Sequence, residues 1–431
     1  MKVAFYTLGC KVNIYETENV EKEFKNRGYE IVSFDEVADV YVINTCSVTN
    51  TSDQKSRKII RSCKKKNKDA IIIAMGCYTQ IKYEEASKID GVKIVIGNKY
   101  KNEVVDLLEE YLKTKKPIVK INKLNREKFE DMKISNFENH TRAFIKVQDG
   151  CNNFCSYCII PYTRGNIRSK NKDDVINEVK ELAKNGYKEI VLTGIDTGHY
   201  GLDIKDYDFS DLLNDLEKID GIERIRISSV EITDLNDKFL QTLKNSKKIV
   251  DHIHIPLQSG CDKILKLMNR KYDLEFFFKK INEIRSIRKD MAITTDVIVG
   301  FPGETDEDFN DTVNTIKKVG FTELHVFPYS KREGTKAATM SNQVDGLVKK
   351  DRVRKLISLS NELKETYYKK FLGNKMEVLV EQNIDGYFIG HLSNYGKVKF
   401  VSDVREENKI VDVKLLKYEN DVFYGEKLQN N

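Results

Sequence analysis

Residues 141–165 have the sequence TRAFIKVQDGCNNFCSYCIIPYTRG, in which an apolar strand candidate leads directly into three closely spaced cysteines. These are Cys151, Cys155 and Cys158. Three thiolates on one loop can ligate three irons of a cubane cluster and leave the fourth iron open. A structural zinc ion normally takes a fourth Cys or His, and this loop contains no His. The loop therefore favours a catalytic iron-sulfur site, with zinc as the alternative.

The chain around this loop alternates strand candidates with helical stretches. Strands are predicted at AFIKV, EIVLTG, RIRIS, HIHIP, AITTDVIV and ELHVFP, and amphipathic stretches such as DDVINEVKELAKNG follow them. Six such units predict a partial (β/α)6 barrel of the TIM type. Active sites of these barrels lie at the C-terminal strand ends. Gly194, Glu231 and Gln258 lie at such ends, although each alone is also compatible with an ordinary turn or cap.

A second set of three cysteines lies in the N-terminal part of the chain. Cys10, Cys46 and Cys77 each follow an apolar run directly, and these runs alternate with amphipathic stretches. The pattern predicts an open parallel α/β sheet. Because ligands of such sheets bind outside the carboxyl ends of the strands, we expect the three thiols to converge and hold a second cluster, with simple packing as the alternative. Cys63 and Cys261 lie outside this pattern and are expected to be free thiols.

The remaining segments predict a three-part organisation. The charged stretch 113–139 has weak periodicity and is predicted to be a linker. Residues 369–431 switch to period two, with MEVLVEQ, YFIGHLS and GKVKFVS separated by turn residues, which predicts a small antiparallel β-barrel. The expected domains are therefore 1–115, 137–366 and 369–431.

Composition and charge constrain the class of protein less than the motifs do. The net charge is +6, and no apolar run is long enough to span a membrane. We expect a cytoplasmic protein without a membrane partner, in which eight cysteines serve metal binding or stay reduced rather than form disulfides. A predicted basic helix is a candidate for contact with RNA phosphates, and a solvated helix face is the alternative. Its candidate residues are Lys55, Arg57, Lys58, Arg61 and Lys64.

The three-cysteine loop resembles the signature of the radical S-adenosylmethionine (SAM) superfamily, in which an aromatic residue, here Tyr157, precedes the last cysteine. In that superfamily the open iron binds SAM. The resemblance implies SAM-binding roles for Tyr157, Gly194, Glu231 and Gln258.

The motifs LGCKVN, INTCSVT and MGCYTQ, which contain the N-terminal cysteines, narrow the resemblance to the methylthiotransferases, and it covers nearly the whole chain. In that family the small C-terminal barrel is called TRAM. The resemblance implies two 4Fe-4S clusters. One cluster, held by Cys151, Cys155 and Cys158, binds SAM exchangeably. The other, auxiliary cluster is held by Cys10, Cys46 and Cys77.

Lys11-Val12-Asn13 is similar to the branch that acts on N6-threonylcarbamoyladenosine of tRNA. The isopentenyladenosine branch typically has Gln-Met-Asn there, and the ribosomal-protein branch Pro-Lys-Asn. The resemblance therefore implies methylthiolation of N6-threonylcarbamoyladenosine at position 37, next to the anticodon, to give the 2-methylthio derivative. The other two branches and a zinc-containing RNA-binding protein are the alternatives.

As the resemblance implies, SAM serves both as the methyl donor, to a sulfur on the auxiliary cluster, and as the source of the radical that removes hydrogen from adenine C2. Because this carbon carries no acidic proton, we expect no general base. The implied partners are tRNA, SAM, an external reductant and a sulfur source.

Overall fold

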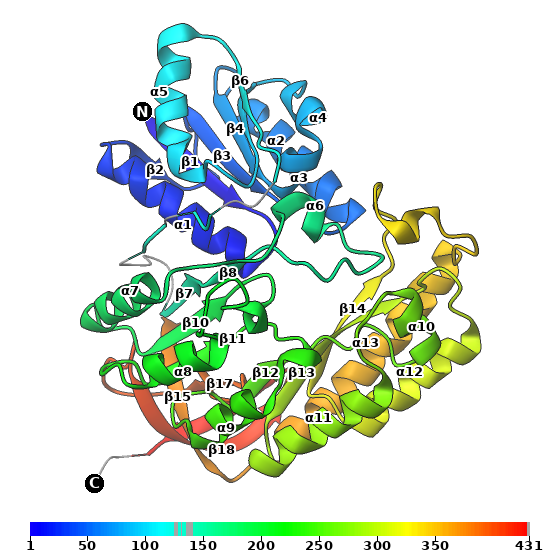
Figure 1. Ribbon diagram of the computed structural model, residues 1–431. Helices are drawn as coiled ribbons and strands as arrows, with labels where there is room; N and C mark the ends of the chain where they lie inside the picture. Colours follow the sequence, from blue (N-terminus) through cyan, green and yellow to red (C-terminus); the bar gives the residue numbers. More distant parts are fainter. Residues whose placement is uncertain (125–127, 131, 135–140, 429–431) are drawn as a thin grey trace.

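The computed structural model describes residues 1–431 except 125–127, 131, 135–140 and 429–431. The predicted linker 113–139 and the domain boundary at residue 137 therefore lie partly outside the described residues. Figure 1 shows an N-terminal α/β domain above a partial barrel, with a small β-barrel at the opposite end. Within the described ranges, no helix is both long enough and apolar enough to cross a membrane.

The N-terminal domain is a six-stranded sheet in the order β2-β1-β3-β4-β5-β6, and all its strand pairs are parallel. Helices α1 and α5 pack on one face, and α2 and α4 on the other. The expected open parallel sheet is confirmed. Its elements are β1 (Lys2–Thr7), α1 (Lys11–Asn26), β2 (Glu30–Val32), β3 (Val40–Thr45), α2 (Asn50–Lys66), β4 (Ile71–Gly76), α3 (Cys77–Ile81), α4 (Tyr83–Ser87), β5 (Val92–Ile96), η1 (Lys101–Glu103), α5 (Val104–Thr114) and β6 (Ile118–Lys120).

Strand β6 lies in the stretch predicted to be a linker. It pairs with β5 through Ile94 and Ile118, so the sheet continues past the expected boundary at residue 115. The first part of the charged stretch is thus structured because Ile118 faces the apolar layer under α5.

The central domain contains the six predicted barrel strands. They form two three-stranded parallel sheets, β11-β10-β7 and β12-β13-β14, joined by a bridge between Ser229 and His254. A continuous apolar core packs helices α7, α8, α9, α11 and α12 against them. The expected partial barrel is confirmed. Its elements are β7 (Arg142–Lys146), β8 (Gln148–Asp149), α6 (Ile160–Arg164), β9 (Arg168–Ser169), α7 (Lys172–Lys184), β10 (Glu189–Thr193), η2 (Thr197–His199), α8 (Phe209–Glu217), β11 (Arg224–Ile227), η3 (Ile232–Asp234), α9 (Asp237–Asn245), β12 (His252–His254), α10 (Asp262–Leu267), α11 (Leu274–Ile287), β13 (Ala292–Val299), α12 (Asp306–Val319), β14 (Glu323–Pro328), η4 (Lys336–Thr339) and α13 (Gly346–Lys369).

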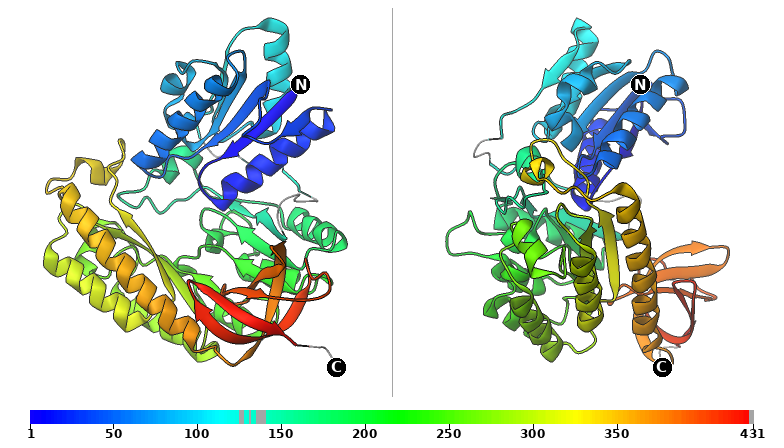
Figure 2. Two further views of the ribbon diagram at one scale, coloured as in Figure 1. Left: turned by 180° about the vertical axis from the view of Figure 1, so that it is seen from behind. Right: turned by 90° about the vertical axis from the view of Figure 1, so that its right-hand side faces the viewer.

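The C-terminal domain is a closed barrel in the order β15-β16-β17-β19-β18, as the period-two pattern predicts. Its strand pairs are antiparallel as expected, except that β17 and β19 pair in parallel. Figure 2 shows that it packs against the partial barrel on the side away from the N-terminal domain. The guanidinium groups of Arg224 and Arg226 donate to its backbone carbonyls at His391 and Ser393, at 3.0 and 3.2 Å. Its strands are β15 (Lys375–Ile384), β16 (Tyr387–Leu392), β17 (Lys397–Phe400), β18 (Ile410–Glu419) and β19 (Val422–Lys427).

Candidate active site

The cysteine loop of the partial barrel follows β8. Gly150, which precedes Cys151, has φ +75°, and a Cβ atom there would lie 2.0 Å from the carbonyl oxygen of Asn166, so this tight turn requires glycine. Burial and the neighbouring thiols raise the pKa of Cys151 and of Cys158 to about 12. The structure thus gathers three thiols in one loop, where binding a metal would release the protons of Cys151 and Cys158.

The N-terminal cysteines also lie together. Cys10 caps α1, Cys46 follows β3 and Cys77 begins α3, so all three occupy the carboxyl ends of neighbouring strands. A Cβ atom on Gly9 would lie 3.0 Å from Cys46 Sγ. Burial and the thiols of Cys77 and Cys10 raise the pKa of Cys46 to about 11. The parallel sheet therefore brings the three thiols to one edge.

Asn98, in the loop that follows β5, bridges the two cysteine sites. Its side-chain amide donates to the carbonyl of Thr163 at 2.7 Å and lies 3.5 Å from Cys77 Sγ. Thr163 belongs to α6, the short helix that ends the barrel's cysteine loop, and α6 packs on α3. One amide thus links a thiol of the first set to the loop that carries the second.

A buried ion network fixes this junction. The Arg164 guanidinium contacts Glu16 at 3.0 Å and Asp149 at 3.1 Å, and donates to Asn13 Oδ1 at 2.7 Å. Lys146 pairs with Glu16 at 2.8 Å. Burial opposes ionisation of Glu16, but Arg164 and the lysines outweigh it and hold the pKa of Glu16 below its ordinary value. Paired charges therefore hold the N-terminal domain on the barrel mouth.

A cavity of about 180 Å³ lies between the two cysteine loops. Val48 and Thr49, which follow Cys46, line one side, and Tyr157, Cys158 and Gln258 line the barrel side. Residues of β13 and the end of β14 complete its wall. Cys158 therefore lines the cavity directly, and the residues that follow Cys46 form the opposite wall.

The expected SAM-binding residues surround the barrel's cysteine loop. Tyr157 and Gln258 line the cavity. At Gly194, a Cβ atom would lie 2.9 Å from Gln148 Oε1, so only glycine fits beside this amide. Glu231 forms an ion pair with Arg270. The structure therefore places all four near the cysteines, with Glu231 already paired.

Two further polar residues at this position escaped sequence reasoning. Arg270 Nη1 lies 3.3 Å from Cys155 Sγ, and no local pattern marks it. Asp196, two residues after Gly194, is buried, and its carboxylate lies 3.3 Å from Nδ1 of His199. Burial and the charge of Glu231 raise the pKa of Asp196 well above its ordinary value. Its position after a barrel strand was the available signal.

Lys11, the residue after Cys10, begins α1, which packs on β7 of the partial barrel. Burial opposes ionisation of Tyr395, but the Lys11 ammonium and Arg142 outweigh it and lower the pKa of Tyr395. Tyr395 belongs to the small barrel and its ring lies 4.4 Å from the Arg226 guanidinium and 4.9 Å from the His252 ring. The charge of Lys11 in the first domain therefore acts on Tyr395 in the third.

The basic residues of α2 lie along the outer part of that helix. Arg57, Arg61 and Lys64 line a surface cavity of about 660 Å³ together with Glu85 and Asp90, while Lys55 and Lys58 are exposed. Arg57 pairs loosely with Glu85, at 3.8 Å. The helix therefore offers cations to a ligand, partly offset by neighbouring carboxylates.

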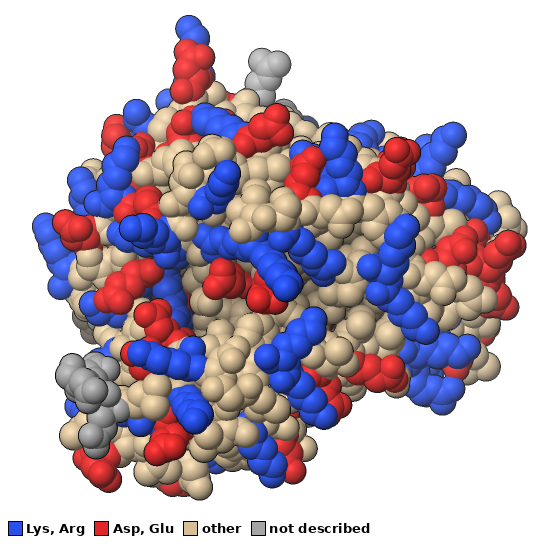
Figure 3. Space-filling view, turned by 90° about the horizontal axis from the view of Figure 1, so that it is seen from below, with Lys and Arg blue, Asp and Glu red and all other residues tan. Residues whose placement is uncertain are grey.

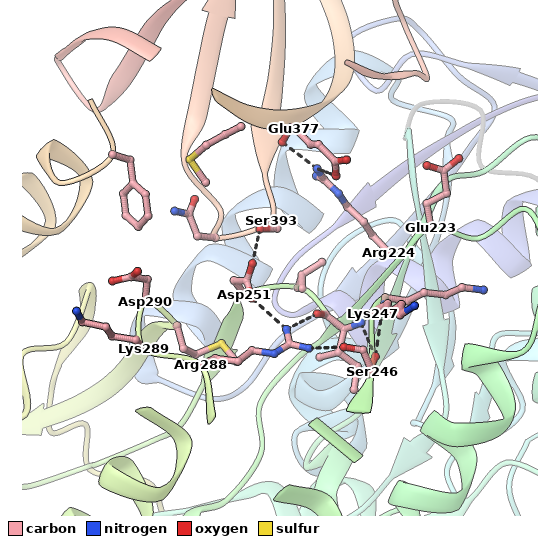
Figure 4. A pocket seen from close by; sticks show the side chains of 17 residues that line it. Glu223, Arg224, Ser246, Lys247, Asp251, Arg288, Lys289, Asp290, Glu377 and Ser393 are labelled. Carbon is pink, nitrogen blue, oxygen red and sulfur yellow. Dashed lines mark hydrogen bonds and ion pairs between the residues drawn. The ribbon is translucent and has the colours of Figure 1, made fainter. Parts of the chain in front are cut away.

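A second large cavity, of about 530 Å³, lies at the far end of the barrel, against the small β-barrel (Figure 4). Several of its polar groups are bonded to one another: Arg288 pairs with Asp251 at 3.0 Å, and Ser393 donates to Asp251 at 2.9 Å. Figure 3 shows the molecule from below, where basic and acidic side chains alternate. We interpret this cavity as a joint between domains, because no cysteine lines it.

The fold and the two cysteine sets define the class of radical SAM enzymes, and the family model "Radical SAM superfamily" matches residues 145–316. A model described as "Uncharacterized protein family UPF0004" matches residues 2–97. Threonylcarbamoyladenosine tRNA methylthiotransferase MtaB of Bacillus subtilis (strain 168) is 46% identical over 422 residues, 96% of this chain and 94% of that protein. The chain belongs to the radical SAM methylthiotransferase family.

Other relatives extend this result. The protein of the same name from Aquifex aeolicus (strain VF5) is 42% identical and covers 89% of this chain and 94% of its own. The tRNA-2-methylthio-N(6)-dimethylallyladenosine synthase of Thermoanaerobacter sp. (strain X514) is 37% identical and covers 95% and 89%. Membership confirms the expected enzyme class, with 4Fe-4S clusters and SAM as cofactors.

Solved structures agree on the fold. The radical SAM methyltransferase TsrM from Kitasatospora setae, with cobalamin and a 4Fe-4S cluster bound, has a TM-score of 0.58 at 13% identity, and the match covers 78% of this chain and 77% of that one. The cobalamin-dependent SAM radical enzyme OxsB has a TM-score of 0.51 at 11% identity, covering 85% and 56%. At such identities the likeness concerns the fold alone.

Proposed function

We propose that this chain methylthiolates C2 of N6-threonylcarbamoyladenosine in tRNA, at the position next to the anticodon. The observation that carries the proposal is the contact of Asn98 with both Cys77 and the barrel's cysteine loop. Group transfer from one metal centre to a carbon activated at another requires both centres to reach one cavity. The relatives that are 46% and 42% identical carry this nucleoside in their names.

In this proposal each cysteine set holds one cluster. Cys151, Cys155 and Cys158 bind the cluster that takes SAM, and Cys10, Cys46 and Cys77 bind the auxiliary one. Three thiolates per cubane leave one iron open in each. The sulfur source and the reductant reach the protein from outside, in the cytoplasm.

The residues beside the barrel's cysteine loop fit SAM. The buried carboxyl group of Asp196 is suited to the amino group of a ligand, and Arg270, beside Cys155, offers a guanidinium to a carboxylate. When bound, SAM supplies a methyl group and, on the reduced cluster, a 5′-deoxyadenosyl radical. Glu231, which pairs with Arg270 in this structure, would share that guanidinium with the carboxylate of SAM, while Gly194 leaves room for the side chain of Gln148.

The cavity between the clusters fits a base extruded from an RNA loop. Phe327 lines it and is 41% exposed, so an aromatic face is available for stacking. The cations of α2, among them Lys55 and Lys58, contact the RNA phosphates in this proposal. In this proposal the base thus stacks on an aromatic ring and the phosphates contact the basic helix.

Iron counting after anaerobic reconstitution tests the proposal. We expect about eight irons per chain for two cubanes, and about four when Cys10, Cys46 and Cys77 are all changed to alanine. Cys63→Ala, which alters a buried thiol on α2, is the matched control and keeps about eight.

The product identifies the substrate. Mass spectrometry of tRNA nucleosides from cells with and without the protein should show 2-methylthio-N6-threonylcarbamoyladenosine only when it is present. The dimethylallyl counterpart in its place would favour the activity named for the relative that is 37% identical. Bound zinc without release of 5′-deoxyadenosine under reduction would refute the radical mechanism.

A further inference from the structure

The Lys11 ammonium has no hydrogen-bond or ion-pair partner in the part of the chain that the structure describes. It follows Cys10 at the start of α1, the helix that packs on β7 of the partial barrel, and it is only partly exposed. Its charge acts on Tyr395 and His252. Holding a cation in a partly buried site without a counter-ion is unfavourable.

The neighbouring cations are all paired. Arg226 contacts Glu189 at 2.6 Å and Arg142 contacts Glu381 at 3.1 Å. On the barrel wall, His254 and His325 both face Asp296, at 3.3 and 3.2 Å. Other cations near the two cysteine loops are paired as well, among them Arg164, Lys146 and Arg270, whose partners are Glu16, Asp149 and Glu231. Lys11 differs from these cations, because no anion within the described ranges pairs with it.

We propose that Lys11 binds the carboxylate of the threonylcarbamoyl group and so selects this substrate over adenosines with an apolar N6 substituent. The inference rests on the proposed function and names the residue that reads the substituent. C6, which carries N6, and C2 flank the same ring nitrogen of adenine, so a group that holds the N6 substituent must lie near the junction where sulfur is delivered to C2. Lys11 is suited to this role because it begins α1, whose N-cap is Cys10 and whose Asn13 and Glu16 contact the barrel mouth.

The chemistry favours an acid over a neutral group. A lysine ammonium is a compact charge with three donors, and a charge-assisted hydrogen bond to a carboxylate is among the strong ones. An apolar substituent at the same place would keep the ammonium from water without pairing it, which adds a penalty against the wrong substrate. Lys11 would therefore both attract the acidic substituent and disfavour the apolar one.

The test compares two anticodon stem-loop RNAs, one with N6-threonylcarbamoyladenosine and one with its neutral methyl ester. For each reconstituted full-length enzyme, the ratio of kcat/KM for acid over ester is measured. We expect wild type to prefer the acid by about ten- to a hundredfold, Lys11→Met to bring the ratio near one, and Lys11→Arg to keep most of the preference. Lys113→Met, which removes an exposed lysine of the same domain, should keep the wild-type ratio.

The ratio of kcat/KM for acid over ester distinguishes failure of the Lys11 proposal from failure of the proposed function. Because both rates come from the same loaded enzyme, a general loss of clusters in Lys11→Met cancels. If Lys11→Met keeps the full preference, or if wild type shows none, Lys11 does not bind the carboxylate. If wild type makes no methylthio product on either RNA but reacts with a dimethylallyladenosine stem-loop, the proposed function itself is wrong.

Discussion

Arg164 is a fully buried cation whose partners come from two domains. Replacing it with methionine leaves Glu16 and Asp149 buried with fewer counter-charges, which should cost about 3–5 kcal/mol of stability. Thermal unfolding of the apoprotein measures the loss. Arg27→Met is the control, because Arg27 pairs with Glu23 and Asp106 at the surface, where ion pairs contribute little. Equal melting temperatures for the two variants would contradict this account.

Cys63 provides a pH-dependent prediction. Burial raises the pKa of its thiol to about 12, so about one molecule in ten thousand carries the thiolate at pH 8. The raised value favours the neutral thiol in the folded state, and this stability is complete below pH ~8.5 and lost as pH rises toward 12. In the folded enzyme, iodoacetamide should alkylate Cys63 about tenfold faster per pH unit above 8. Rapid labelling at pH 8 would show that the thiol is accessible.

The sequence predicts the cysteines better than their surroundings. Spacing and position after apolar runs mark six cysteines as two sets, and the structure gathers each set. Arg164 and Glu16 lie 148 residues apart, and their hydrogen bond leaves no local pattern in either segment. Asn98 is one polar residue after a buried strand, indistinguishable in sequence from a turn residue. Sequence reasoning therefore missed the contacts that individual polar residues make with partners far along the chain.

At the scale of an element, the turn from β4 into α3 positions Cys77. Gly76 has φ +107°, and a Cβ atom there would lie 2.5 Å from Asn44 Oδ1 and 2.6 Å from the carbonyl oxygen of Thr45. Gly76→Ala should therefore shift α3 and lower the iron content from about eight toward about four per chain.

Gly28 is the matched control for this prediction. It also has positive φ, +80°, but a Cβ atom there would have no neighbour within 4 Å. Gly28→Ala should destabilise by about 1 kcal/mol through the backbone alone and keep the iron content. Full iron in Gly76→Ala would show that the turn does not position the auxiliary ligand.

Elements differed in how readily the sequence predicts them. The barrel strands were predictable because each is apolar and followed by an amphipathic helix. Strand β6 was not, because its three residues, Ile118–Lys120, are too few to show a period and lie within a run of charges. Its pairing with β5 depends on tertiary contact, which overrides local composition.

At the scale of the whole molecule, the loop after β14 ties the barrel to the N-terminal domain. Arg332 contacts Asp53 at 2.9 Å, and donates to Ser47 Oγ and Asn50 Oδ1, each at 2.7 Å. Ser47 directly follows Cys46, so this arginine joins the barrel to the loop that carries an auxiliary thiol. The tie complements the network around Arg164 on the other cysteine loop.

Changing Arg332 to methionine should therefore uncouple the two centres without removing either. Misplacing a donor relative to its acceptor by about 1 Å can cost about a hundredfold in rate, so we expect methylthio product to fall at least tenfold. Release of 5′-deoxyadenosine under reduction should persist, because Cys151, Cys155 and Cys158 lie on the barrel itself. Arg354→Met, at a side chain that is 82% exposed, is the control and should retain both activities. If the two activities of Arg332→Met fell in parallel, the arginine would support the barrel as a whole and not the alignment of the domains.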